Sequence, residues 1–242
     1  MPTEHKHERI ARLIRESLGP PGSTLPSEAQ LVEKYEVGRG TIRQALATLE
    51  YEGLITSSQG NRRTVRDGRR WEWPMSEWER AHSNDGDAWA NTIRAQGGEP
   101  KNEMRITTIE APADVAKVLQ IPEGTPIQAR YRVRSVDGIP HQLSESYFPP
   151  FVTDDNELFW DPRDVGVQGG LLAATGHKQA RWYDTITSRM PTAEESQQLR
   201  MALGTPLLVH TRTGFDAEDR PVRYLVTRMA ADQVQVSYNL EA

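Results

Sequence analysis

The chain contains 242 residues, which is more than one small domain requires and enough for two. Hydrophobic residues form 36% and charged residues 26% of the sequence, a globular balance that excludes a disordered chain. No apolar run approaches the roughly 20 residues of a membrane span, the start MPTEHKHERI lacks a secretory signal, and the absence of cysteine excludes disulfides and thiolate metal sites. We therefore expect a cytoplasmic protein of two domains with no membrane association, metal or cofactor.

The net charge of −5 is unevenly divided along the chain. Residues 1–70 hold 12 Lys and Arg against 9 Asp and Glu, giving +3, while the remainder holds 17 against 25, giving −8. Association with phosphate depends on local charge, so an acidic total does not exclude a DNA-binding N-terminal segment. The basic surplus gathers at Arg62, Arg63, Arg66, Arg69 and Arg70.

The apolar spacing near the N-terminus predicts three helices. The first covers about residues 5–18, and the break GPPGSTLPSE follows it. The second begins after an N-cap at Ser27 and runs to about Tyr35, and the third runs from near Arg39 to Gly53. Three short helices with a tight turn form the helix-turn-helix pattern.

Two short strand-like segments follow these helices, LITS and RTVR, joined by the turn SQGNR. Gly60 at the tip of that turn can adopt a positive φ. Such a hairpin is the wing of a winged helix, which lies beside the helix that enters the major groove. The N-terminal segment is therefore predicted to be a winged helix-turn-helix.

Polar residues mark the outer face of the third helix, and Arg39 and Arg43 project from the same side because they are four residues apart. Arginines there are suited to guanine edges or phosphates. The alternative is a charged helix face that is only solvated. The candidate DNA-binding residues of this helix are Arg39, Thr41, Arg43 and Gln44.

The stretch LPSEAQLVEKYEVGRGTIRQALATLEYEGLITSSQGNRRTV resembles the winged helix of the GntR family of bacterial regulators. This resemblance implies that the recognition helix and the wing, through Gly60, Arg62 and Arg63, contact DNA. The chain departs from the family where an arginine is usual after PSE and a serine before the recognition-helix arginine, since Ala29 and Gly38 stand there. The wing also reads QGNRRTV in place of QGRGTFV, so the operator is expected to differ from the commonest family site.

Residues 69–88 mix charges with Trp71, Trp73 and Trp78, and we interpret them as a linker between domains 1–68 and 89–242. Tryptophans are unusual in a fully solvated linker, so this segment is expected to pack against a domain or a second subunit. A short amphipathic helix without a signalling role is the alternative.

Two stretches of the second domain match in spacing, with one constant offset between their equivalent positions, which we call the repeat offset. Each stretch is predicted to contain a helix, a GTP turn, a strand, a hairpin and a strand. Outer strands near 103–110, 181–188 and 233–240 would complete one antiparallel sheet flanked by helices, an α+β fold. The first set of matched residues is Asp114, Leu119, Gly124, Thr125, Pro126 and Arg132, and the second, in the same order, is Glu194, Leu199, Gly204, Thr205, Pro206 and Arg212.

Arg130, Arg132 and Arg134 alternate along one predicted strand and so project from one face. Exposed arginine is common, so a solvated sheet face is one interpretation. The other is a site for an anionic ligand, since guanidinium groups bind phosphate and carboxylate with two parallel hydrogen bonds.

Residues 89–242 resemble the effector-binding (UTRA) domain of the HutC branch of GntR regulators, whose fold is similar to chorismate lyase. QGGEP, LQIPEGTPI, RVRSVDGIP with SYFP, and DRPV carry this resemblance. It implies that Arg132 and Arg134 match the positions that hold the phosphate of the effector in sugar-phosphate-sensing members. The predicted effector-binding residues are Arg132, Arg134, Ser144, Glu145, Tyr147 and Arg223.

Two departures from those members bear on the effector. Ser144 stands where a glutamate is expected, with Glu145 displaced by one position, and Arg223 stands where a glutamate often follows the late Pro-Val pair. Losing two carboxylates favours a more anionic or less hydroxylated effector, phosphorylated or carboxylated. The alternative is a site that has lost phosphate binding.

The sequence thus predicts a transcriptional regulator, a repressor that binds an inverted-repeat operator as a homodimer under the control of a small anionic effector. A second domain that only dimerises is one alternative. A lyase-like enzyme is another, which the absence of a nucleophile motif, a metal constellation or a glycine-rich phosphate loop disfavours.

Overall fold

The computed structural model describes residues 5–57, 63–66, 68–75, 87–154, 156–162, 170–201 and 204–239. The chain divides into two compact units, one of residues 1–69 with 190–206 and one of residues 70–189 with 207–242. Among the described residues, no helix is long and apolar enough to span a bilayer.

The first unit contains the three predicted helices, α1 (Lys6–Glu16), α2 (Glu28–Tyr35) and α3 (Arg39–Tyr51), together with α9 (Ala193–Gln198). Apolar residues at helical spacing pack into one core between α1, α2 and α3, which confirms the prediction of these helices. Its buried members are Ile10, Ala11, Ile14, Leu25, Leu31, Val37, Ile42, Ala45, Leu46, Leu49, Ile55 and Val65.

The ends of these helices follow from local sequence. The Ser27 side chain accepts a hydrogen bond from the Gln30 backbone at 3.3 Å, and the Gln30 side chain accepts one from the Ser27 backbone at 2.8 Å, so α2 begins with a capping box. Gly38 precedes α3 without a side-chain cap. Gly53, which follows the C-cap residue Glu52 of α3, adopts a φ of 70°, a conformation that favours glycine.

The predicted wing is an antiparallel pair, β1 (Ile55–Ser57) with β2 (Arg63–Val65), in which Ile55 lies opposite Val65. Both of these residues are buried in the core of the three helices. The tip of the wing, which includes Gly60 and Arg62, lies outside the described residues.

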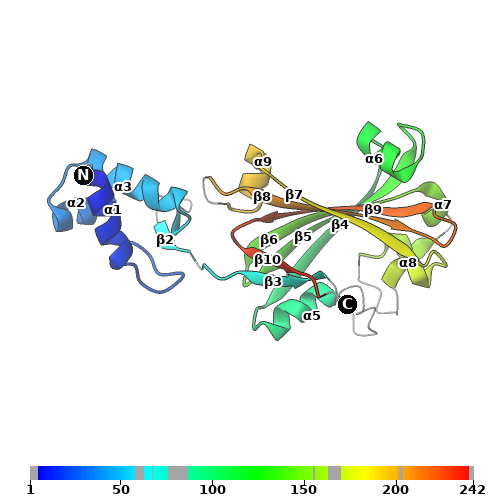
Figure 1. Cartoon of the computed structure of the whole chain (residues 1–242), viewed down its shortest axis with the longest axis horizontal. Helices are drawn as coiled ribbons and strands as arrows, with labels where there is room; N and C mark the ends of the chain where they lie inside the picture. The colour runs from blue at the N-terminus through cyan, green and yellow to red at the C-terminus, as the bar shows by residue number, and fades with distance from the viewer. Residues whose placement is uncertain are drawn as a thin grey trace. The chain divides into compact units, whose positions relative to one another are not determined.

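The second unit is built on a six-stranded antiparallel sheet in the order β4-β5-β6-β9-β8-β7. Two meanders, β4-β5-β6 and β7-β8-β9, meet at β6 and β9, and β4 and β7 form the edges (Figure 1). The strands are β4 (Pro100–Glu110), β5 (Pro126–Val136), β6 (Ile139–Phe148), β7 (Arg181–Arg189), β8 (Leu207–Phe215) and β9 (Pro221–Ala230).

The register confirms the repeat that the sequence predicts. Met104 of β4 lies opposite Arg132, and Asp184 of β7 lies opposite Arg212, so equivalent pairs recur at the repeat offset. Helix α6 (Ala113–Leu119) precedes β5 as α9 precedes β8 in the chain.

The segment predicted to be the last outer strand does not join this sheet, which corrects the expectation. Strand β10 (Val234–Ser237) instead pairs in parallel with β3 (Trp71–Pro74) as a separate two-stranded sheet. The turn after β9, closed by the Gln233 backbone donating to Ala230, redirects the chain, and the Trp71 backbone donates to Gln233 at 2.9 Å.

Strand β3 also shows how the predicted linker segment packs. Trp71 and Trp73 are buried, the first with Ile93 of α5 (Ala88–Ala95) and the second with Met229. The expectation that these tryptophans pack against a domain is therefore confirmed, whereas Trp78 lies outside the described residues.

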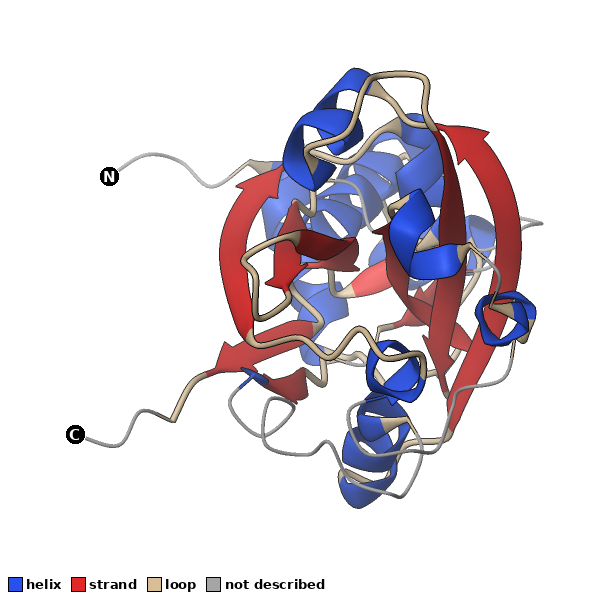
Figure 2. Cartoon of the chain, turned by 90° about the vertical axis from the view of Figure 1, so that its right-hand side faces the viewer, coloured by secondary structure: helices blue, strands red, loops and turns tan. Residues whose placement is uncertain are grey.

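The sheet has two chemically different faces because side chains alternate along each strand. We call the side that carries Arg130, Arg132 and Arg134 the arginine face. The opposite side, where α6 packs on Ala129 and Tyr147, is the α6 face (Figures 1 and 2). Packed against the arginine face are α5, the β3-β10 pair and the short helices α7 (Pro150–Thr153), η1 (Glu157–Trp160) and α8 (Gly170–Ala174).

Candidate DNA-binding and effector-binding sites

Helix α3 presents the predicted recognition surface. Arg39, Arg43 and Gln44 are exposed and Thr41 is half-buried, while the apolar residues between them point into the core. The helix has no acidic residue of its own in its first turn, where Arg39 lies. This arrangement leaves polar and cationic side chains available to the edges of base pairs.

Glu28, the first residue of α2, holds this surface in place. Its carboxylate accepts hydrogen bonds from Arg43 Nε at 3.0 Å and from an Arg63 terminal nitrogen at 3.3 Å. The hydrogen bond from Arg43 is the main reason that the pKa of Glu28 is lowered. Sequence analysis missed this role, although the glutamate of the LPSE motif at the start of a helix was the available signal.

Arg63 is the one predicted wing residue that the structure describes. Its guanidinium is only 19% exposed and donates to Glu50 at 2.7 Å as well as to Glu28. Arg63 thereby ties β2 to α2 and α3. Its predicted contact with DNA phosphate stays a prediction. A phosphate that bound Arg63 would compete with the carboxylates of Glu28 and Glu50.

The arginine face is densely cationic and largely buried. Arg132 of β5 lies opposite Ser144 of β6, Ser144 lies opposite Thr227 of β9, and Thr227 lies opposite His210 of β8. This row places residues of both repeats on one face of the sheet. Its arginines are Arg130, Arg132, Arg134, Arg212 and Arg223.

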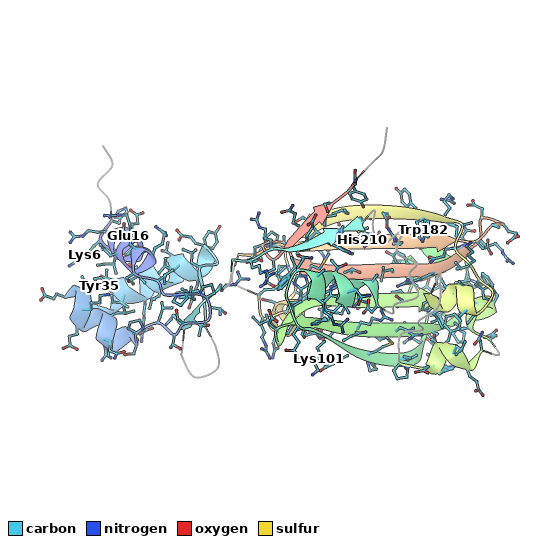
Figure 3. All side chains as sticks on the ribbon, turned by 90° about the horizontal axis from the view of Figure 1, so that it is seen from below. Lys6, Glu16, Tyr35, Lys101, Trp182 and His210 are labelled. Atoms are coloured by element: carbon cyan, nitrogen blue, oxygen red, sulfur yellow. The ribbon has the colours of Figure 1, made fainter. Side chains whose placement is uncertain are left out.

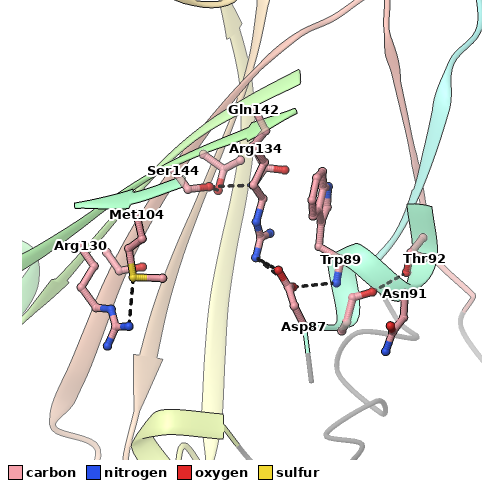
Figure 4. Close-up of polar contacts among 12 residues, drawn as sticks. Asp87, Trp89, Asn91, Thr92, Met104, Arg130, Arg134, Gln142 and Ser144 are labelled. Atoms are coloured by element: carbon pink, nitrogen blue, oxygen red, sulfur yellow. Dashed lines mark hydrogen bonds and ion pairs between the residues drawn. The ribbon is translucent and has the colours of Figure 1, made fainter. Parts of the chain in front are cut away.

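Arg134 is bound to a carboxylate at the beginning of α5. Its guanidinium lies 3.0 Å from both carboxylate oxygens of Asp87 and 4.8 Å from the centre of the Trp89 ring (Figure 4). Asp87 also caps α5 by accepting from the Trp89 backbone at 3.1 Å. An anionic ligand that used Arg134 would have to share it with Asp87.

Arg130 contacts neutral acceptors. It donates to the Met104 sulfur at 3.1 Å (Figure 4). It also donates to the backbone oxygens of Phe159 at 3.3 Å and Asp161 at 2.9 Å. These bonds hold the segment around η1 against the sheet.

Arg223 is a cation of the arginine face whose hydrogen-bond acceptor is neutral. It donates to the Ser146 hydroxyl at 2.8 and 3.3 Å and lies 5.9 Å from the Phe148 ring, and no described carboxylate forms an ion pair with it. Burial, followed by the charge of Arg132 and of the other arginines on this face, lowers the pKa of Arg223 to about 9. It is therefore a cation at pH 7 in a site of positive potential.

In the second repeat, Arg212 and His210 share one carboxylate, which comes from the neighbouring strand β7. Asp184 lies 2.7 Å from His210 Nε2 and accepts two hydrogen bonds from Arg212, both at 2.7 Å. Burial raises the pKa of Asp184, but the bonds from His210 and Arg212 outweigh it and lower the pKa to about 2. The centre of the Trp182 ring lies 5.9 Å from the Arg212 guanidinium. Trp182 and His210 are both labelled in Figure 3.

The strand register divides the predicted effector-binding residues between the two faces of the sheet. Glu145 and Tyr147 alternate with Ser144 and Ser146 and so lie on the α6 face, opposite the arginines. There the Tyr147 hydroxyl donates to Glu145 at 2.7 Å, and Glu145 pairs with Arg228. One site cannot include these two residues together with Arg132, Arg134, Ser144 and Arg223.

The structure adds residues that sequence analysis left out of the site. Asp87 and Asp184 both bind arginines, and Arg130 and Arg212 complete the arginine face. The exchange of Met104 for Asp184 at equivalent repeat positions was the available signal for Asp184. Asp87 gave none, because it lies outside the repeat.

A winged helix with a basic recognition helix, joined to a sheet domain with a buried cationic face, defines a class of proteins: DNA-binding regulators with a ligand domain. Comparison with known families agrees. The family described as "Bacterial regulatory proteins, gntR family" matches residues 2–65, and the UTRA domain matches residues 95–235.

Similar proteins include an HTH-type transcriptional regulator of Rhizobium meliloti, RB1450, which is 30% identical over 88% of this chain and 84% of its own length. The regulator GgaR of Escherichia coli is 23% identical over 93% of this chain and 85% of its own. The crystal structure of PhnF from Mycobacterium smegmatis shares the fold, with a TM-score of 0.60 at 22% identity over 96% of this chain and 99% of that one. The chain belongs to the GntR family of transcriptional regulators, in its UTRA-containing HutC branch.

Membership defines the general activity. The protein is a transcription regulator and not an enzyme, binding DNA through the winged helix and an effector through the UTRA domain.

Proposed function

We propose that this protein is a cytoplasmic repressor that binds an inverted-repeat operator as a homodimer, with domains 1–68 and 89–242 joined by the linker 69–88. Two-fold symmetry of the dimer would place two α3 helices in successive major grooves and would be mirrored in the operator. The exposed Arg39, Arg43 and Gln44 support the groove-reading part of this proposal.

The controlling effector is a small anion bound on the arginine face. The observation that carries this part is Arg223, a partly buried cation whose hydrogen-bond acceptor is a neutral serine hydroxyl and whose neighbours are arginines. A buried charge is costly unless an opposite charge is close, so an acidic ligand group would be bound favourably between Arg223 and Arg132.

The effector can regulate only if it binds one arrangement of the DNA-binding heads better than the other. A footprint on the DNA upstream of the protein's own gene, repeated with phosphorylated and carboxylated metabolites, would locate the operator and test this coupling. An operator without two-fold symmetry would contradict the homodimer.

Arg43 tests the recognition helix. If it reads a base, Arg43→Ala will weaken specific binding by about 1–3 kcal/mol, measured by titration of operator DNA. Arg220→Ala, which removes an exposed arginine of the β8-β9 hairpin, is the matched control and should leave binding unchanged. Equal affinity of the Arg43 variant and the wild-type protein would refute this role.

Arg223 tests the anion site. Arg223→Met removes a desolvated cation while keeping much of the volume, so we expect lost binding of anions together with unchanged or higher thermal stability. Calorimetric titration with phosphosugars and dicarboxylates measures the first and thermal melting the second. Unchanged anion binding in this variant would place the effector elsewhere.

A further inference from the structure

Gln128 is a buried amide on the arginine face that has no hydrogen-bond partner among the described residues. The residue is 3% exposed, and neither its Nε2 nor its Oε1 forms a hydrogen bond with a described donor or acceptor. An unsatisfied buried polar group costs roughly 1–3 kcal/mol, and Gln128 carries two such atoms. A residue kept for packing alone would not need them.

The position of Gln128 places it in the proposed effector site. It precedes Arg130 by two residues and so shares its face, and it lies opposite Phe148 of β6. The ring of Phe148 is in turn 5.9 Å from the guanidinium of Arg223. Gln128 and Arg223 therefore flank the same aromatic side chain, from β5 and from β9.

The second repeat supplies an internal comparison. The residue of the second repeat that is equivalent to Gln128 is Leu208, which packs with Trp73 and Met229. The fold thus accepts an apolar residue at this place. The amide is present only in the first repeat, which supplies Arg132 to the proposed anion site.

We infer that Gln128 determines effector specificity by hydrogen-bonding a neutral polar group, a hydroxyl or an amide, of the ligand whose acidic group is held by Arg223 and Arg132. This rests on the proposed anion site. The effector is then a small bifunctional molecule, acidic at one end and neutral but hydrogen-bonding at the other. An amide can donate to and accept from such a group at once.

Thermal melting tests the inference without a ligand. Gln128→Leu installs the residue of the second repeat and removes both unsatisfied atoms, so the Tm should rise by roughly 2–4 °C. The matched control is Gln142→Leu on the same face, because the Gln142 amide donates to Ser144 at 2.7 Å, and its loss should lower the Tm. A lower Tm for the Gln128 variant would mean that its amide is already satisfied, as by a buried water, and would overturn the inference.

Calorimetry with the full chain tests the ligand side, using inorganic phosphate and glycerol 3-phosphate as probes. Wild-type protein should bind glycerol 3-phosphate more tightly than phosphate, and Gln128→Leu should reduce that preference about tenfold while leaving phosphate binding intact. An unchanged preference would overturn the inference and leave the anion site standing. If neither probe bound the wild-type protein, the anionic effector would be refuted, and the melting comparison would still decide whether Gln128 is unsatisfied.

Discussion

The two halves of the effector domain have the same strand plan but treat their buried basic groups differently. In β7-β8-β9 the carboxylate that pairs with Arg212 and His210 is Asp184, which belongs to the same repeat. In β4-β5-β6 the equivalent position is Met104, and the carboxylate that pairs with Arg134 comes from Asp87, outside the repeat at the start of α5.

The difference shows how buried arginines of one sheet can contribute to stability around Arg212 and to ligand binding around Arg134. An acid on a neighbouring strand is fixed by backbone hydrogen bonds and cannot leave without breaking the sheet. Asp87 lies at a helix N-cap outside the sheet and its carboxylate also accepts from the Trp89 backbone, so an external anion can compete for Arg134 without breaking a strand. The part of the arginine face around Arg134 is therefore better suited to a reversible ligand than the part around Arg212.

Removal of Asp184 should have the largest effect. Asp184→Ala leaves Arg212 and the 1% exposed His210 without their carboxylate, and such a loss costs about 3–5 kcal/mol of unfolding free energy. Met104→Ala at the equivalent position should cost clearly less, because it breaks no ion pair. Urea denaturation of both variants measures this, and equal losses would remove the asymmetry between the halves.

Acid should weaken the two halves in different pH ranges. His141 of β6 is buried, and burial lowers its pKa from 6.5 to about 4, so its contribution is full above pH 6.5 and is lost as pH falls toward 4. The loss amounts to about 3 kcal/mol. The contribution of Asp184 in the second half is full above pH 3.8 and is lost as pH falls toward 2.

Denaturation curves between pH 7 and 4 for the wild-type protein and His141→Gln check this. The difference in stability between them should shrink or reverse as the pH falls, since the variant has no imidazole to protonate. A difference that does not change with pH would show that His141 is protonated equally in the folded and unfolded chains.

Asp87 should give the smallest of these effects. Asp87→Asn keeps an oxygen that can cap α5 but removes the charge that pairs with Arg134, so inorganic phosphate should bind about tenfold more tightly. Isothermal titration measures the change, and Asp184→Asn is the control in which it should be absent. Weaker phosphate binding by the Asp87 variant would show that this carboxylate supports the site instead of competing for it.

Much of the fold could be predicted from local patterns. Helical spacing, the Ser27 cap and Gly53 predicted the three helices, because these signals act within a few residues. The matched spacing of the repeat predicted two equivalent halves, and alternation along β5 predicted the row of arginines. The placement of strand 233–240 was wrong, since a strand pattern does not reveal its partner.

The sequence by itself therefore determined a winged DNA-binding head, a duplicated sheet and a cationic strand. Only the tertiary structure decided that Glu145 and Tyr147 face away from Arg132, that Asp87 meets Arg134 from outside the repeat, and that Gln128 is buried without a partner among the described residues. The reason is physical: periodicity is local to an element, whereas charge pairing and burial depend on which elements dock together.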